Sequence, residues 1–132
     1  MFELHPRLED DTIFVADWPL SRVLLMNDRR FPWLVMVPRR EDLRELHDLL
    51  PEDGATLMQE VARASRTLKM LTSAAKMNIG ALGNLVPQLH IHIIARALDD
   101  AAWPGPVWGC GAAVPYATVT RDAFLERLES EL

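Results

Sequence analysis

VPQLHIHIIAR, residues 86–96, alternates polar and apolar side chains over its central part. A period of two is typical of a β-strand with one buried face. On such a strand Gln88, His90 and His92 point to one side, and Leu89 and the isoleucines at alternate positions point into a core. Imidazole can act as a nucleophile, proton carrier or metal ligand near neutral pH. The segment therefore predicts a chemically active row on one face of a sheet.

Three shorter segments closer to the N-terminus also have strand character, at residues 12–17, 22–26 and 33–37. Pro19 suits a turn between the first two, since proline fixes φ and cannot extend a central ladder. Asn27 and Asp28 offer the second turn. Short connections favour antiparallel neighbours, so these segments predict a three-stranded meander.

A long helix is predicted from Pro51, because proline is tolerated in the first helical turn. Apolar residues follow at steps of three and four and form one stripe: Leu57, Val61, Ala64, Leu68, Leu71 and Ala75. A shorter helix is expected over about 42–49. A last helix is expected after Thr120 as its cap, with Phe124, Leu125 and Leu128 on its apolar side.

A fourth strand over about 76–79 and a glycine-containing turn at 80–84 lead into the histidine segment. Residues 99–115 are rich in Pro, Gly and Ala and predict a surface loop. The order of strands, long helix, two strands and tail indicates an α+β domain with helices on one face of an antiparallel sheet. We expect a single domain over 1–132, with a core of about 10–100 and a C-terminal tail of about 101–132.

Length and charge limit the classes of function. The chain has 132 residues and a formal net charge of −5, which suits one core and argues against nucleic acid as a partner. No apolar run is long enough for a bilayer, and no secretory signal begins the chain. The one cysteine, Cys110, excludes an intrachain disulfide and fits a reducing compartment. We expect a cytoplasmic protein without a membrane partner.

The histidine row suits phosphoryl chemistry. A neutral imidazole nitrogen can attack phosphorus and form a phosphoramidate that water later cleaves. His90 lies at the centre of the row and is the candidate nucleophile. His92 could donate a hydrogen bond to phosphate oxygens where charge builds up, and Gln88 could do so from the other side. Arg96, at the end of the segment, could reach a phosphate.

A metal site is the main chemical alternative at this stage, since His90 and His92 could both be ligands. A catalytic zinc site needs a third protein ligand. His5, His47, Cys110 and carboxylates are candidates, but no sequence spacing forces any of them close. We therefore expect no metal and no cofactor, and the alternative stays open here.

The histidine segment resembles the signature of the histidine triad superfamily, in which three histidines alternate with apolar residues. Here the signature reads Gln88-Leu89-His90-Ile91-His92-Ile93-Ile94. Residues 33–39, WLVMVPR, are similar to the apolar strand of that family, which ends in proline and a basic residue. Asn78-Ile79-Gly80 with Gly83-Asn84 is similar to its phosphate loop. The likeness covers residues of about 10–100.

The resemblance implies a fold and an activity. Members have an antiparallel five-stranded sheet with two helices and usually form homodimers. They hydrolyse or transfer nucleoside monophosphates from phosphoramidates, dinucleoside polyphosphates or nucleotide sugars. By that likeness His90 would form a nucleotidyl intermediate and His92 would contact the phosphate. Asn78 and Asn84 would lie near phosphate and sugar, with Gly83 in the same loop.

Two positions depart from the family pattern. Gln88 replaces the first histidine, and Leu85 stands where a serine or threonine often assists the leaving group. A lost hydroxyl contact of about 1 to 3 kcal/mol would slow the reaction by up to roughly two orders of magnitude. We expect an active enzyme that is slower or differently selective. The alternative from another class is a nucleotide-binding module with little catalysis.

Overall fold

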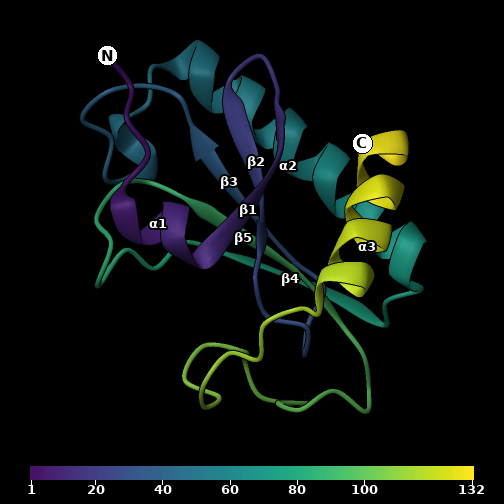
Figure 1. The fold of residues 1–132 in the computed structure, drawn as a ribbon. Coiled ribbons are helices and arrows are strands. Elements are labelled where there is room, and N and C mark those ends of the chain that lie inside the picture. Colours follow the sequence, from purple (N-terminus) through teal and green to yellow (C-terminus); the bar gives the residue numbers. More distant parts are fainter.

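The computed structural model describes all residues of the chain, 1–132. Five strands form one antiparallel sheet in the order β1-β2-β3-β5-β4 (Figure 1). Their bounds are β1 Thr12–Asp17, β2 Ser21–Met26, β3 Trp33–Pro38, β4 Lys76–Gly80 and β5 Ile91–Arg96. The predicted fold class and meander are confirmed.

The helices are α1 Pro6–Asp11, α2 Pro51–Thr72 and α3 Thr118–Glu131, with one 3₁₀ turn, η1 Leu46–Asp48. The long helix begins at Pro51 as predicted. None of the helices combines the length and apolar character that crossing a bilayer demands.

Three details of the helix predictions differ from the structure. The helix expected over 42–49 is only the η1 turn, because the Asp48 carboxylate accepts the backbone N–H groups of Arg44 and Glu45 and closes a short turn. Thr120 does not cap α3, which begins after Ala117 with no side-chain cap. α1 was not predicted; it begins at Pro6, where His5 Nδ1 accepts the N–H of Arg7.

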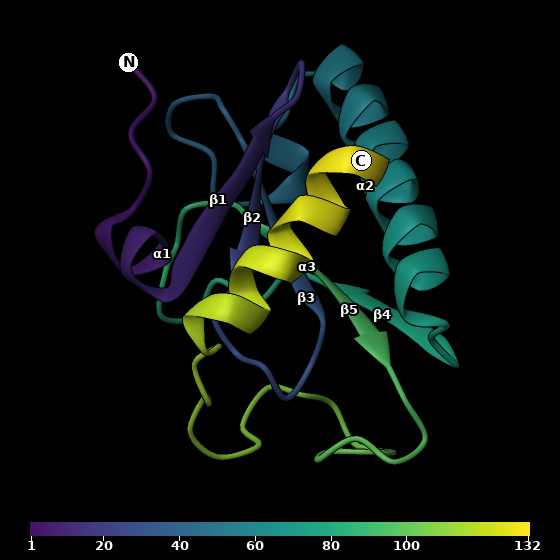
Figure 2. The same ribbon diagram turned by 45° about the vertical axis from the view of Figure 1, so that its right-hand side comes forward.

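The long helices cover one face of the sheet (Figure 2). The apolar stripe of α2 packs there together with Leu128 of α3 and the inward side chains of the strands. Leu89, Ile91 and Ile93 belong to this core, as the alternating pattern predicts. Burial of a large aliphatic side chain stabilises the fold by about 1.5 to 3 kcal/mol, so this face provides most of the fold's apolar stabilisation.

The opposite face has a smaller core that includes Trp33, Val35, Ile94 and Val107. Helix α1, the chain before it and the loop after β5 cover this side (Figures 1 and 2). His92 is paired with Val35 in the β3–β5 register and therefore faces this second core. The sheet thus places His92 on the face away from the long helices α2 and α3.

Helix α2 also anchors the turn between β1 and β2. The buried Glu60 carboxylate accepts the backbone N–H groups of Leu20 and Ser21, each at 3.0 Å. This satisfies both oxygens of a buried acid, as buried carboxylates require. The turn itself was predicted from Pro19, but its anchor on a helix 40 residues away was not.

Candidate active site

β5 is shorter than the strand that alternation predicts. It begins at Ile91, so Gln88 and His90 lie before it and only His92 lies within it. Pro87 has no N–H to donate, and the Leu89 N–H donates instead to the Leu43 carbonyl at 2.9 Å. The segment 86–90 therefore leaves the sheet and lies against the loop that follows β3.

His90 has a defined tautomer. Its Nδ1 lies 2.7 Å from the carbonyl oxygen of Gln88. A carbonyl oxygen can only accept, so the neutral ring has its proton on Nδ1 and an unprotonated Nε2. The ring is 6% exposed and lines a cavity of about 270 Å³ together with Arg44, His47 and Gly83. His90 therefore has one unprotonated ring nitrogen and is one of the residues that line this cavity.

His92 has the opposite tautomer. Trp33 Nε1 donates to His92 Nδ1 at 3.0 Å, so the ring proton is on Nε2. Burial, and then the neighbouring His90, lower the pKa of His92 to about 4. The ring is 5% exposed and lies edge-on to Trp108 and to His90, with centroids 5.4 and 4.8 Å apart. His92 is therefore a neutral hydrogen-bond donor at physiological pH.

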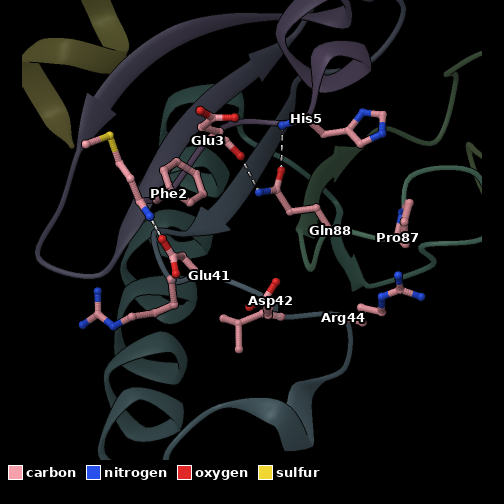
Figure 3. A pocket seen from close by; sticks show the side chains of 11 residues that line it. Phe2, Glu3, His5, Glu41, Asp42, Arg44, Pro87 and Gln88 are labelled. Atoms are coloured by element: carbon pink, nitrogen blue, oxygen red, sulfur yellow. Dashed lines mark hydrogen bonds and ion pairs between the residues drawn. The ribbon is translucent and has the colours of Figure 1, made fainter.

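The side chain of Gln88 is directed toward the N-terminal segment. Its Oε1 accepts the N–H of His5 and its Nε2 donates to the Glu3 carbonyl, both at 2.8 Å (Figure 3). Because both ends of the amide have backbone partners, Gln88 acts on the site mainly through its own carbonyl, which holds His90.

Arg96 and Asn78 are brought together beneath the loop that follows β5. Arg96 is 2% exposed; it donates to both oxygens of Asp100 at 2.8 and 2.9 Å and to Asn78 Oδ1 at 2.8 Å. The hydrogen bond from Arg96 lowers the pKa of Asp100 to about 2. The guanidinium lies over the rings of Phe31 and Trp103. A direct phosphate contact by Arg96 would require this network to open.

Asp100 shapes the loop that covers His92. Besides Arg96, its carboxylate accepts the backbone N–H groups of Ala97, Ala102 and Trp103. The same loop carries Trp108 over β4, where a Cβ at Gly80 would lie 3.2 Å from the Trp108 ring. Glycine at position 80 thus permits the close approach that puts Trp108 against His92.

The remaining predicted residues lie around the cavity. Gly83, in the left-handed region at φ +76°, lines it. Asn84 is exposed and its side chain has no hydrogen-bond partner in the chain. No three His, Cys, Asp or Glu side chains gather in an arrangement suited to a metal ion. His90 and His92 therefore have no third ligand beside them.

Trp33, Trp108 and Asp100 shape this site, but sequence reasoning did not assign them these contacts. Trp33 was recognised only as part of a strand, and Trp108 only as a member of the loop predicted over residues 99–115. The visible signal for Asp100 was its position four residues after Arg96, which has no fixed meaning outside a helix. Each contact depends on tertiary structure.

Comparisons with known proteins identify the family of the chain. The HIT domain profile matches residues 7–98, so the chain belongs to the histidine triad (HIT) family, whose members are nucleotide-binding hydrolases or transferases. Among curated proteins no match is found.

Solved structures provide three further comparisons. A histidine triad protein from Bradyrhizobium japonicum is 49% identical, with a TM-score of 0.96 over 98% of this chain and 97% of that one. One from Marinobacter aquaeolei is 43% identical, with a TM-score of 0.98 over 100% and 96%. A histidine triad nucleotide-binding protein from Sulfolobus tokodaii, at 14% identity and a TM-score of 0.67 over 95% and 86%, shares the fold alone.

The lowered pKa of His92 predicts a pH-dependent stability. Because the folded pKa of about 4 lies below the ordinary 6.5, the unfolded chain binds the proton more readily. The free energy of unfolding is therefore highest, with respect to this group, above about pH 6.5. It decreases as the pH falls toward 4, by about 3 kcal/mol at most. Urea unfolding across this range should show a flatter dependence for His92→Phe than for the wild type. His47→Phe, at an 84% exposed side chain, should follow the wild type; equal slopes for all three proteins would contradict the assignment.

The Arg96–Asp100 pair predicts a second stability effect. Asp100→Ala leaves a buried guanidinium without its carboxylate and should lower the free energy of unfolding by about 3 to 5 kcal/mol. The same substitution should also increase the rate of hydrogen exchange in the loop after β5. Asp99→Ala, at the exposed neighbour, should change stability by less than about 0.5 kcal/mol. Equal effects of the two substitutions would show that the pair does not hold the loop.

Proposed function

We propose that this protein is a nucleotide hydrolase or nucleotidyltransferase that cleaves at the α-phosphate of nucleoside phosphate derivatives. Dinucleoside polyphosphates and nucleoside phosphoramidates are the substrate classes. The observation that carries the proposal is the pair of complementary imidazoles. His90, which lines the cavity, has an unprotonated Nε2, and His92, whose ring centroid lies 4.8 Å from that of His90, has a protonated Nε2. One ring can attack phosphorus while the other donates to its oxygens.

In the first step His90 Nε2 supplies an electron pair to the α-phosphorus. A P–N bond forms, the bond from phosphorus to the leaving group breaks, and that pair departs with the leaving group. The ring becomes an imidazolium whose Nδ1–H still donates to the Gln88 carbonyl. Splitting the displacement in this way lowers the barrier of each half.

In the second step an acceptor displaces the imidazole. For hydrolysis a water oxygen bonds to phosphorus, the P–N bond breaks, and its electron pair returns to Nε2; the released proton passes to solvent or to the departed group. With a phosphate acceptor the same displacement is a nucleotidyl transfer. His90 is regenerated as the same tautomer, because the Gln88 carbonyl keeps its Nδ1 protonated.

His92 supplies electrostatic stabilisation. A donor that is already oriented and dehydrated contributes more than the same donor in water, and each such donor in an active site can contribute about 2.7 to 4 kcal/mol. The low pKa of His92 keeps it neutral, so it does not compete electrostatically with the imidazolium that forms at His90. We assign His92 to the non-bridging phosphate oxygens.

The other predicted residues have supporting roles in this proposal. Gly83 lines the cavity, and its loop, with Asn84, is assigned to phosphate and sugar. Arg96 and Asn78 act by holding the loop that carries Trp108 over His92, since the Arg96 guanidinium and Asn78 Oδ1 already have partners. Gln88 is assigned to orient His90 through its carbonyl.

We also propose that the chain works in the cytoplasm as a homodimer that uses the β4 edge. β4 is an outer strand of the sheet, and unpaired edges are ready to associate. Beside it lies a mainly apolar cavity of about 380 Å³ between α2 and β4, which includes Met58 and Ile79. Both side chains are exposed in the single chain.

A nucleotide-binding module with little catalysis is the competing proposal. Two observations favour it: the Gln88 amide is engaged by the N-terminal segment, and Leu85 supplies no hydroxyl to a leaving group. A metal-dependent hydrolase would need a ligand besides His90 and His92, and a chelator would stop its reaction.

The decisive variant is His90→Ala. Removing the nucleophile should lower turnover of adenosine phosphoramidate and diadenosine polyphosphates by at least about 10³-fold. Nucleotide binding, measured by calorimetry, should remain, since the cavity is kept. Turnover within tenfold of the wild type would end the nucleophile assignment. A wild-type protein that binds nucleotide but turns over neither substrate would establish the binding module instead.

A further inference from the structure

Gln88 makes contacts in two directions. Its side chain holds residues 3 and 5 near the N-terminus, and its carbonyl holds His90. We propose that Gln88 is a positioning residue. Its side chain ties the N-terminal segment, residues 1–5, which we call the strap, to the site, and this attachment fixes the orientation of the His90 ring. The consequence for catalysis rests on the proposed function.

The side-chain amide of Gln88 hydrogen-bonds to two backbone groups of the strap. An amide presents one acceptor and one donor side by side, which match the His5 N–H and the Glu3 carbonyl (Figure 3). The two nitrogens of an imidazole diverge and cannot serve both groups at once. This gives a physical reason for glutamine at position 88, where the family signature has histidine.

The strap is attached to the protein independently of Gln88. Phe2 and Leu4 pack against the second core, and the His5 ring accepts the Arg7 N–H at the start of α1. Residues 3 and 5 are therefore held between anchored neighbours. A hydrogen bond to an anchored partner restricts the Gln88 backbone more than one to a mobile chain end.

The peptide between Gln88 and Leu89 connects the strap to the nucleophile. Its carbonyl faces His90 Nδ1 at 2.7 Å, and its N–H donates to the Leu43 carbonyl at 2.9 Å. The peptide plane is thus held from both sides, while the strap holds the Gln88 side chain. If the side-chain hydrogen bonds of Gln88 open, the Gln88 carbonyl that faces His90 is held by the Leu89–Leu43 hydrogen bond alone, and the orientation of the His90 ring is less restricted.

Gln88 also separates two cavities. A cavity of about 360 Å³ lies on the strap side and the His90 cavity lies on the other; Gln88 and Arg44 line both. A rearrangement of Gln88 therefore changes the wall of the His90 cavity. A misplacement of about 1 Å can lower a rate 10²-fold, so the strap should influence kcat more than KM.

The first test replaces Gln88 by methionine, which has a similar length but neither hydrogen bond. We expect Gln88→Met to increase hydrogen exchange over residues 3–8 and to change the long-range ¹H–¹⁵N spectrum of the His90 ring. Its kcat should fall by about 10- to 100-fold, with KM changed less than about threefold. Gln59→Met, on the exposed face of α2, should match the wild type in every measurement.

The second test acts on the strap itself. The φ of His5 is −56°, which proline adopts without strain, so His5→Pro removes the N–H that Gln88 accepts. His5→Ala loses the same ring but keeps the N–H. We expect His5→Pro to lower kcat and to shift the His90 signals relative to His5→Ala. In the double variant with Gln88→Met the effects should not add, because both remove one shared bond.

The possible results distinguish the positioning role of Gln88 from the proposed enzymatic function. Unchanged exchange and unchanged His90 signals in Gln88→Met would overturn the strap. Faster exchange with the wild-type kcat and His90 signals would show a merely structural link and would also overturn it. If the wild type turns over no substrate, the proposed function fails, while the exchange and ring spectra still decide whether the strap orients His90.

Discussion

The hydrogen bond between His90 Nδ1 and the Gln88 carbonyl is the contact on which the chemistry of the site depends. It fixes the proton on Nδ1 and leaves Nε2 unprotonated in a residue that lines the cavity. In the next residue of the same row, Trp33 imposes the reverse arrangement on His92. Two identical side chains thus have opposite chemical roles because their hydrogen-bond partners differ: the Gln88 carbonyl is an acceptor and the Trp33 indole N–H is a donor.

These partners depend on how the second face of the sheet is covered. Trp33 belongs to its small core, and Trp108 lies in the loop that the Arg96–Asp100 pair holds in place. Desolvation makes a buried ion pair costly unless its remaining polar groups are satisfied. Here Asn78 and three backbone N–H groups complete the set. The burial that lowers the pKa of His92 is therefore a product of this loop.

The sequence allowed most elements to be predicted because their patterns are local. The apolar stripe of α2, the proline at its start and the alternation around Ile91 each reflect contacts repeated within one segment. The family signature pointed to His90 and His92. The start of β5 was missed because the Leu89 N–H finds its partner at Leu43, which alternation cannot reveal.

The rest of the site was outside the reach of sequence patterns because its contacts join distant segments. Gln88 was expected to face a phosphate, yet its side-chain amide binds the backbone of His5 and Glu3, which lie 83 and 85 positions earlier in the chain. Arg96 was expected to reach a phosphate, yet it is buried and donates its hydrogen bonds to Asp100 and Asn78. The sequence shows which polar side chains could do chemistry at a site, but it does not show which groups they will hydrogen-bond in the folded chain.

The most direct test is a long-range ¹H–¹⁵N NMR spectrum of the histidine rings in the unliganded protein at pH 7. We expect the ring of His90 to be protonated at Nδ1 and bare at Nε2, and that of His92 to be protonated at Nε2 and bare at Nδ1. If His90 instead has its proton on Nε2, it has no electron pair to offer at the cavity, and the assignment of His90 as nucleophile is contradicted.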